Sequence, residues 1–171
     1  LMPITFFLIY KGSIFFILFL IITFFVSSYE WIKLNKKNEL IKSFGIIFLF
    51  LSFYFAHLLR LEQGFKIFLF IILISILTDI GGYIFGKTFK GPKLTKISPK
   101  KTYAGLIGSF IMSIMGGLIF DELIVIESNL FLLSFILIVS LVSQVGDLVV
   151  SYFKRLAKIK DTGKILPGHG G

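Results

Sequence analysis

The sequence predicts an all-α protein, a polytopic membrane helix bundle with about five complete spans and a partial N-terminal segment. Of its 171 residues 56% are hydrophobic, and the mean hydropathy is +0.95. A soluble domain of this length has too little interior to hide 22 Phe side chains beside its many Ile and Leu. The apolar residues also fall in runs near the roughly 20 residues that a bilayer-crossing helix needs. We treat residues 1–171 as one integral-membrane domain.

The N-terminal run, residues 1–10, is too short to cross a bilayer alone and ends at Lys11 and Gly12. We interpret it as the end of a helix or as an interfacial segment. It lacks the basic start and the small-residue cleavage site of a signal peptide.

Five longer apolar runs follow, and we expect each to cross the bilayer as a helix. Trp31, just after the first run, is expected to anchor it at the interface. His57, near the end of the second, is expected to pack rather than to react. Four glycines in the fourth run should let helices approach closely. The runs are residues 13–29, 43–59, 67–85, 103–120 and 130–150, and the glycines are Gly105, Gly108, Gly116 and Gly117.

The basic residues predict the orientation. Segments 33–42, 87–101 and 154–164 carry 4, 6 and 5 of the 18 Lys and Arg residues, and all three lie on one side of the predicted membrane. The positive-inside rule places them in the cytoplasm and the acidic segment 121–128 outside. The net charge of +9 therefore reflects topology rather than nucleic-acid binding. With no cysteine in the chain, disulfides and thiolate metal ligands are excluded.

Two carboxylates, Asp79 and Asp147, lie inside predicted spans near their cytoplasmic ends. A charged side chain in hydrocarbon costs about 2.5–3.5 kcal/mol on insertion scales, so each needs a partner or a water-filled cavity. A lysine from a neighbouring loop is one candidate partner, and a bound cation or substrate is the other. The glycines Gly81, Gly82 and Gly86 after Asp79 indicate close approach by a helix or a ligand.

Two further stretches favour anion binding. Ser98, Lys100, Lys101 and Thr102 come directly before a predicted helix, whose N-terminus favours phosphate. On the last span, Ser143, Asp147, Ser151 and Lys154 share one helical face, which suits a divalent cation and a polyphosphate. Arg155, Lys158, Lys160, Asp161 and a Gly-rich turn around His169 follow. The sequence contains neither a Walker A motif nor a dinucleotide fingerprint.

These residues resemble one family. The run S-x-x-K-R-x4-K-D-x-G-x2-L-P-G-H-G-G at 151–171 is similar to the signature of the phosphatidate cytidylyltransferases. TDIGGYIFGK at 78–87, KISPKKTYAG at 96–105, SQVGD at 143–147 and the Glu30–Trp31 pair resemble other blocks of that family. The resemblance implies an enzyme of phospholipid biosynthesis in a bacterial inner membrane. It would join CTP to phosphatidic acid with Mg²⁺, giving CDP-diacylglycerol and pyrophosphate.

The resemblance also implies roles for residues in two cytoplasmic site loops, 87–102 and 151–171. It leaves open a second, monovalent cation and a homodimer. The implied catalytic residues are Asp147 (also the metal ligand), Lys154, Arg155, Lys160, Asp161 and His169. The implied substrate-binding residues are Asp79, Ser98, Lys100, Lys101, Thr102, Ser151, Gly168, Gly170 and Gly171.

The sequence departs from the family pattern after Gly171, where the family continues with Asp-Arg-x-Asp and another span. We therefore expect a fragment that is inactive by itself, because that Asp would be the second carboxylate on the metal. A CTP-dependent polyprenol or phytol kinase is an alternative, although it would lack the long run at 151–171. A transporter or a non-catalytic remnant is the other, although the sequence shows no inverted repeat typical of transporters.

Overall fold

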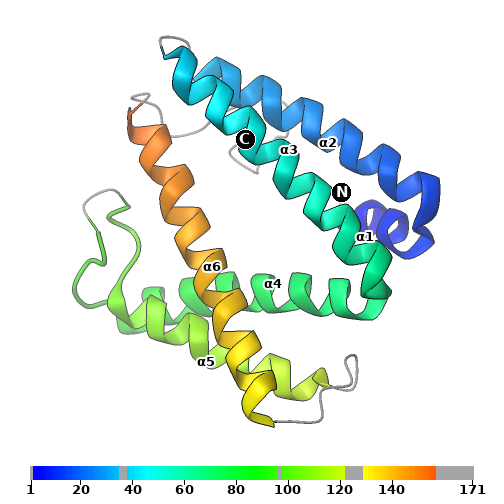
Figure 1. Ribbon diagram of the computed structural model, residues 1–171. Helices are drawn as coiled ribbons and strands as arrows, with labels where there is room; N and C mark the ends of the chain where they lie inside the picture. Colours follow the sequence, from blue (N-terminus) through cyan, green and yellow to red (C-terminus); the bar gives the residue numbers. More distant parts are fainter. Residues whose placement is uncertain (1, 35–37, 96–97, 122–128, 157–171) are drawn as a thin grey trace. The chain divides into compact units, whose positions relative to one another are not determined.

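The computed structural model describes residues 2–34, 38–95, 98–121 and 129–156, and this part of the chain is almost entirely helical (Figure 1). Four of the helices are long and apolar enough to cross a membrane, namely α2, α3, α4 and α6. Within the described ranges the extended pairing is one isolated bridge, between Lys93 and Thr102. The prediction of an all-α membrane protein is confirmed. The helices are α1 (Met2–Lys11), α2 (Ser13–Leu34), α3 (Glu39–Glu62), α4 (Gly64–Phe89), α5 (Tyr103–Ile119) and α6 (Asn129–Leu156).

Each predicted span forms a helix, but most of the helices extend beyond the apolar run that predicted them. The basic segment 33–42, expected as a loop, belongs largely to α2 and α3 in its described part. Asn38 caps α3 by accepting the N–H of Ile41 at 3.1 Å, so the helix begins at Glu39. An apolar run marks only the part that needs hydrocarbon around it, whereas helical hydrogen bonding continues into the polar flanks. The helix α5, with 17 residues, is shorter than the other four predicted spans.

The chain divides into two compact units, residues 66–155 and the remainder. In the N-terminal unit α2 and α3 lie side by side (Figure 1). The indole of Trp31 donates to the carbonyl of Ile41 at 3.1 Å and lies where a Cβ on Gly45 would be, 1.9 Å away. Trp31 thus joins two helices. The ring of His57 lies 6.5 Å from that of Phe16, so it packs against an aromatic side chain of α2.

The second unit contains α4, α5 and α6 and carries the candidate site. Its core is formed by Phe70 and Ile74 of α4 against Leu132 and Ile136 of α6, all at most 3% exposed. The glycines predicted to allow close approach do so, because α4 and α5 meet at nearly bare backbone. A Cβ on Gly81, for example, would lie 2.4 Å from the carbonyl oxygen of Gly108. A helix and a ligand were the two partners expected for Gly81, and the structure shows the neighbouring helix.

Candidate active site

The loop between α4 and α5 is held by its own backbone. Lys90 and Gly91 adopt φ values of +54° and +95°, which turn the chain sharply after α4. The N–H of Leu94 then donates to the carbonyl of Lys101 at 2.8 Å, and that of Tyr103 donates to the carbonyl of Pro92 at 3.2 Å. These bonds pair the two ends of the loop. Lys101 is thereby held at a fixed place beside the start of α5.

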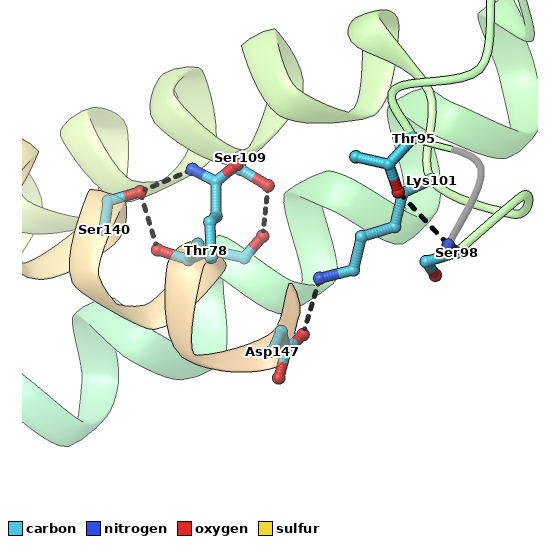
Figure 2. Close-up of polar contacts among 8 residues, drawn as sticks. Thr78, Thr95, Ser98, Lys101, Ser109, Ser140 and Asp147 are labelled. Atoms are coloured by element: carbon cyan, nitrogen blue, oxygen red, sulfur yellow. Dashed lines mark hydrogen bonds and ion pairs between the residues drawn. The ribbon is translucent and has the colours of Figure 1, made fainter. Parts of the chain in front are cut away.

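Thr102 has a structural role that sequence reasoning did not assign. Its hydroxyl oxygen accepts the N–H of Gly105 at 3.1 Å and so caps α5, which begins at Tyr103 as expected. A little earlier in the loop, the N–H of Ser98 donates to Thr95 Oγ1 at 3.1 Å (Figure 2). The stretch predicted to offer anion donors is thus closed by the N–H of Lys101 donating to the carbonyl of Ser98 at 3.0 Å and is followed by a capped helix.

A cavity of about 310 Å³ lies where this loop meets the three helices of the second unit. Polar side chains from all four segments line it, together with a few apolar ones. Two carboxylates and two lysines are among them, so the formal charges of the lining balance. The lining residues are Thr78, Asp79, Gly82, Tyr83, Leu94, Ser98, Lys100, Lys101, Thr102, Gly105, Leu106, Ser109, Gln144 and Asp147.

The clearest charge contact in the cavity joins the loop to α6. Lys101 Nζ donates to Asp147 Oδ2 at 3.0 Å (Figure 2). This is the loop-lysine partner that the sequence had left as one alternative for a carboxylate in a span. The side chains of Lys101 and Asp147 are 31% and 55% exposed, and an ion pair so open to solvent contributes about 0–1 kcal/mol to stability. A charged ligand can therefore replace either partner at little cost.

Asp79 faces the same group of charges from α4. It is close enough to Asp147 to be repelled by it and close enough to Lys101 to be attracted by it. The ammonium group of Lys101 pairs with Asp147, and both of these charges act on Asp79 within the same cavity. Such a set of charges favours a ligand that brings both a cation and phosphate oxygens, since the cation satisfies the acids and the phosphates satisfy the lysines.

The structure brings together six of the predicted site residues, which line one cavity. Ser151, Lys154 and Arg155 lie on α6 beyond Asp147, roughly 6 to 12 Å farther along the helix axis, and are not among the lining residues. The remaining predicted residues lie outside the described part of the chain. The six that line the cavity are Asp79, Ser98, Lys100, Lys101, Thr102 and Asp147. Those outside the described residues are Lys160, Asp161, Gly168, His169, Gly170 and Gly171.

Sequence reasoning missed several polar residues of the cavity, including Thr78, Ser109 and Gln144. Gln144 carried a usable signal, because it lies three residues before Asp147 and therefore on the same helical face. Thr78 and Ser109 carried almost none. Small hydroxyl residues are common in membrane helices, where they often bond to their own backbone.

Comparison with known proteins identifies the family. Residues 39–171 match the family model described as the cytidylyltransferase family. The chain belongs to this family. It is 38% identical over 154 residues to proteins named phosphatidate cytidylyltransferase from Staphylococcus epidermidis and Staphylococcus aureus. The aligned part is 87% of this chain and 59% of those relatives. A Brucella suis protein of the same name is 39% identical over 109 residues, 63% of this chain and 40% of its own length.

This cytidylyltransferase-family chain therefore spans less than two thirds of the curated relatives it matches, about 59% of the Staphylococcus proteins. The family that its motifs resembled is confirmed, and so is its character as an integral membrane protein. The match includes both the loop and the α6 segment that line the cavity. Among the described residues no three or more His, Cys, Asp or Glu side chains gather as a metal site.

Proposed function

We propose that the full-length protein is a phosphatidate cytidylyltransferase, which transfers CMP from CTP to phosphatidic acid and releases pyrophosphate. The observation that supports this most is the cavity in which Asp79, Asp147 and Lys101 meet, in a chain of the cytidylyltransferase family. The lipid substrate is proposed from the name of the Staphylococcus relatives, phosphatidate cytidylyltransferase. The cavity lies among apolar helices, and this reaction must bring a lipid and a nucleotide together.

The chemistry suits a site made of charges rather than of a nucleophilic side chain. A phosphate oxygen of phosphatidic acid attacks the α-phosphorus of CTP, and the bond to the β-phosphate oxygen breaks. Pyrophosphate leaves with that electron pair. Because the attacking phosphate is already a nucleophile, catalysis depends on positioning and on neutralising charge. We propose that Lys100 and Lys101 contact the phosphates, with Ser98 as a hydrogen-bond donor.

The residues present fit Mg²⁺. This ion is usually held by one or two carboxylates plus substrate phosphates, and Asp147 and Asp79 line one cavity and interact electrostatically. We propose that Asp147 holds the ion with a contribution from Asp79. When bound, Mg²⁺ would neutralise charge on the phosphate oxygens. Ser151, Lys154 and Arg155 would extend the phosphate contacts along α6. A second, monovalent cation and a homodimer remain predictions.

We propose that the cavity faces the cytoplasm of a bacterial cell, with the five predicted spans α2, α3, α4, α5 and α6 crossing its inner membrane. The supporting argument is the distribution of Lys and Arg in the sequence. CTP is a cytoplasmic metabolite, whereas phosphatidic acid lies in the bilayer. A cavity at the cytoplasmic ends of spans would be open to both substrates.

The first prediction tests the reaction. Membranes containing the full-length protein, supplied with labelled CTP and Mg²⁺, should form a chloroform-soluble labelled product only when phosphatidic acid is added. Membranes with the Asp147→Asn variant serve as the control and should form almost none. Label supplied in the γ-phosphate should remain in the aqueous phase, because it leaves with pyrophosphate. Transfer of the γ-phosphate to an isoprenoid alcohol, with no product from phosphatidic acid, would favour the alternative of a CTP-dependent polyprenol or phytol kinase.

A further inference from the structure

Three helices of the second unit are joined by hydrogen bonds at one level, through Thr78. Thr78 Oγ1 and Ser140 Oγ are hydrogen-bonded to each other at 3.0 Å, which links α4 to α6 (Figure 2). Ser109 Oγ donates to the carbonyl oxygen of Thr78 at 2.8 Å, which links α5 to α4. Thr78 and Ser140 are 0% exposed and Ser109 is 4% exposed. We call these three residues the hydroxyl clamp.

The hydroxyl clamp lies on the same helices as the two carboxylates and precedes them in the sequence. Thr78 immediately precedes Asp79 on α4, and Ser140 lies seven residues, about two turns, before Asp147 on α6. Gln144 bridges the intervening turns, since it lines the cavity and its Nε2 donates to Ser140 Oγ at 3.4 Å. Thr78 and Ser109 themselves line the cavity. Two of the three clamp residues therefore belong to the cavity wall, and Ser140 is joined to it through Thr78 and Gln144.

Apolar packing alone does not fix the relation between α4 and α6 at this level. Contacts among Ile, Leu and Phe are non-directional and tolerate small rotations and shifts of one helix along another. A hydrogen bond between two buried hydroxyls requires a particular distance and direction. Thr78 Oγ1 also lies 2.8 Å from the carbonyl oxygen of Ile74 on its own helix, so the bond to Ser140 is additional to a bond within α4. By comparison, the bonds that Ser75 on α4 and Ser134 on α6 donate go to carbonyls of their own helices. The cross-helix bonds occur next to Asp79 on α4 and about two turns before Asp147 on α6.

We propose that Thr78, Ser109 and Ser140 are positioning residues that hold Asp79 on α4 at a fixed separation from Asp147 on α6. The expected effect on kcat rests on the proposed function, whereas the expected effect on the separation of the two carboxylates does not. When the clamp is removed, the two carboxylates should sample a wider range of separations. Substrates would still bind, but the charges would be misplaced at the moment of transfer.

The second prediction is kinetic. Thr78→Val removes the hydroxyl and keeps the side-chain shape. Ser140→Ala removes the hydroxyl that is bonded to Thr78 and leaves the rest of this small side chain in place. In the full-length protein each should lower kcat by about 10- to 100-fold, the scale expected for misplaced catalytic groups. The KM for CTP should stay within about threefold of the original value, because ground-state contacts remain. Thr78→Ser should restore most of kcat, and Ser75→Ala, whose hydroxyl bonds only within α4, should leave it unchanged.

The same variants test the separation directly, with no reference to activity. The chain has no cysteine, so spin labels can be placed at Ile84→Cys on α4 and Val149→Cys on α6, both exposed positions in the second unit. Pulsed EPR in bilayers should give a broader distance distribution for Thr78→Val and for Ser140→Ala. Thr78→Ser and Ser75→Ala should keep the original width.

The outcomes separate the two proposals. An unchanged distance distribution in both Thr78→Val and Ser140→Ala would overturn the clamp, whatever the kinetics. A broadened distribution with unchanged kcat would overturn its role in positioning the reacting charges. If the unsubstituted protein made no product from CTP and phosphatidic acid, the proposed function would fail. The EPR widths would still decide whether the clamp fixes the helices.

Discussion

At the scale of single residues, the contact between Lys101 and Asp147 explains how a site can be charged and yet ready for a ligand. The pair is formed at 3.0 Å but is half open to solvent, so it adds at most about 1 kcal/mol to stability. Because both side chains are exposed, either one can leave the pair for a ligand without a large loss of stability. When phosphate and a cation arrive, each partner gains a stronger contact.

The third prediction follows from that difference between stability and function. Asp147→Asn should lower kcat/KM by at least about 100-fold, which is about 2.7 kcal/mol at 1.36 kcal/mol per factor of ten. Lys101→Gln should raise the KM for CTP. Both variants should unfold within a few degrees of the original protein. Lys93→Gln is the matched control, because Lys93 lies in the same loop but is not among the cavity-lining residues. It should change neither kcat/KM nor the KM for CTP. Equal effects of Lys101→Gln and Lys93→Gln would contradict the assignment.

The two carboxylates of the site could be found from sequence because each of them interrupts an apolar run. A carboxylate in an apolar run is anomalous, and this anomaly indicated Asp79 and Asp147, which the structure places in one cavity. Thr78 and Ser140 break no rule, so nothing local indicated that they would meet. Their hydrogen bond depends on how two helices are rotated about their axes. Hydrophobic periodicity gives that rotation for helices in water, but much less for a helix that is apolar all round.

At the scale of helices, glycines determine how closely α4 and α5 can pack. The two helices touch at backbone, and this proximity places the loop and the start of α5 beside Asp79. The small size of the four glycines in the fourth run predicted that helices approach closely there, and the structure confirms it. The sequence did not identify the surface that these glycines contact, because Gly81 on α4 could equally have contacted a ligand.

The fourth prediction compares two glycine substitutions. Gly81→Ala would place a Cβ 2.4 Å from the carbonyl oxygen of Gly108, which is backbone and can move only if the helix moves. Overpacking of this kind costs about 1–3 kcal/mol, so the thermal midpoint in detergent should fall by several degrees. Gly146→Ala on α6 meets nothing within 4 Å and gains helix propensity, so its midpoint should be unchanged or higher. A similar fall for both would show that backbone contact between α4 and α5 is not what limits stability.

At the scale of the whole molecule, the distribution of charge along the chain assigns a side of the membrane to each connection. Composition and run length were enough to predict helices and spans, because hydrocarbon demands internally satisfied backbone over a fixed thickness. They were not enough to predict where each helix ends, since polar flanks can continue a helix or begin a loop. Asn38 shows the difference, because its cap makes Glu39 the start of α3 within a segment expected as a loop.

The fifth prediction tests that assignment. Fifteen of the 18 basic residues lie in segments expected on the cytoplasmic side, and the bias of Lys and Arg toward that side determines orientation. Because the chain has no cysteine, Lys93→Cys and Asp121→Cys each introduce a single thiol at an exposed position. In intact spheroplasts an impermeant thiol reagent should label position 121 and not position 93. Permeabilisation should expose position 93.

If position 93 were labelled from outside, the orientation of the protein would be the reverse of the predicted one. The cavity that includes Lys101 would then face away from the cytoplasmic pool of CTP, because both residues belong to the loop between α4 and α5. The proposed reaction could not proceed from that side, however well the cavity fits phosphate. Topology is therefore the condition on which the assignment of this cavity to CTP depends.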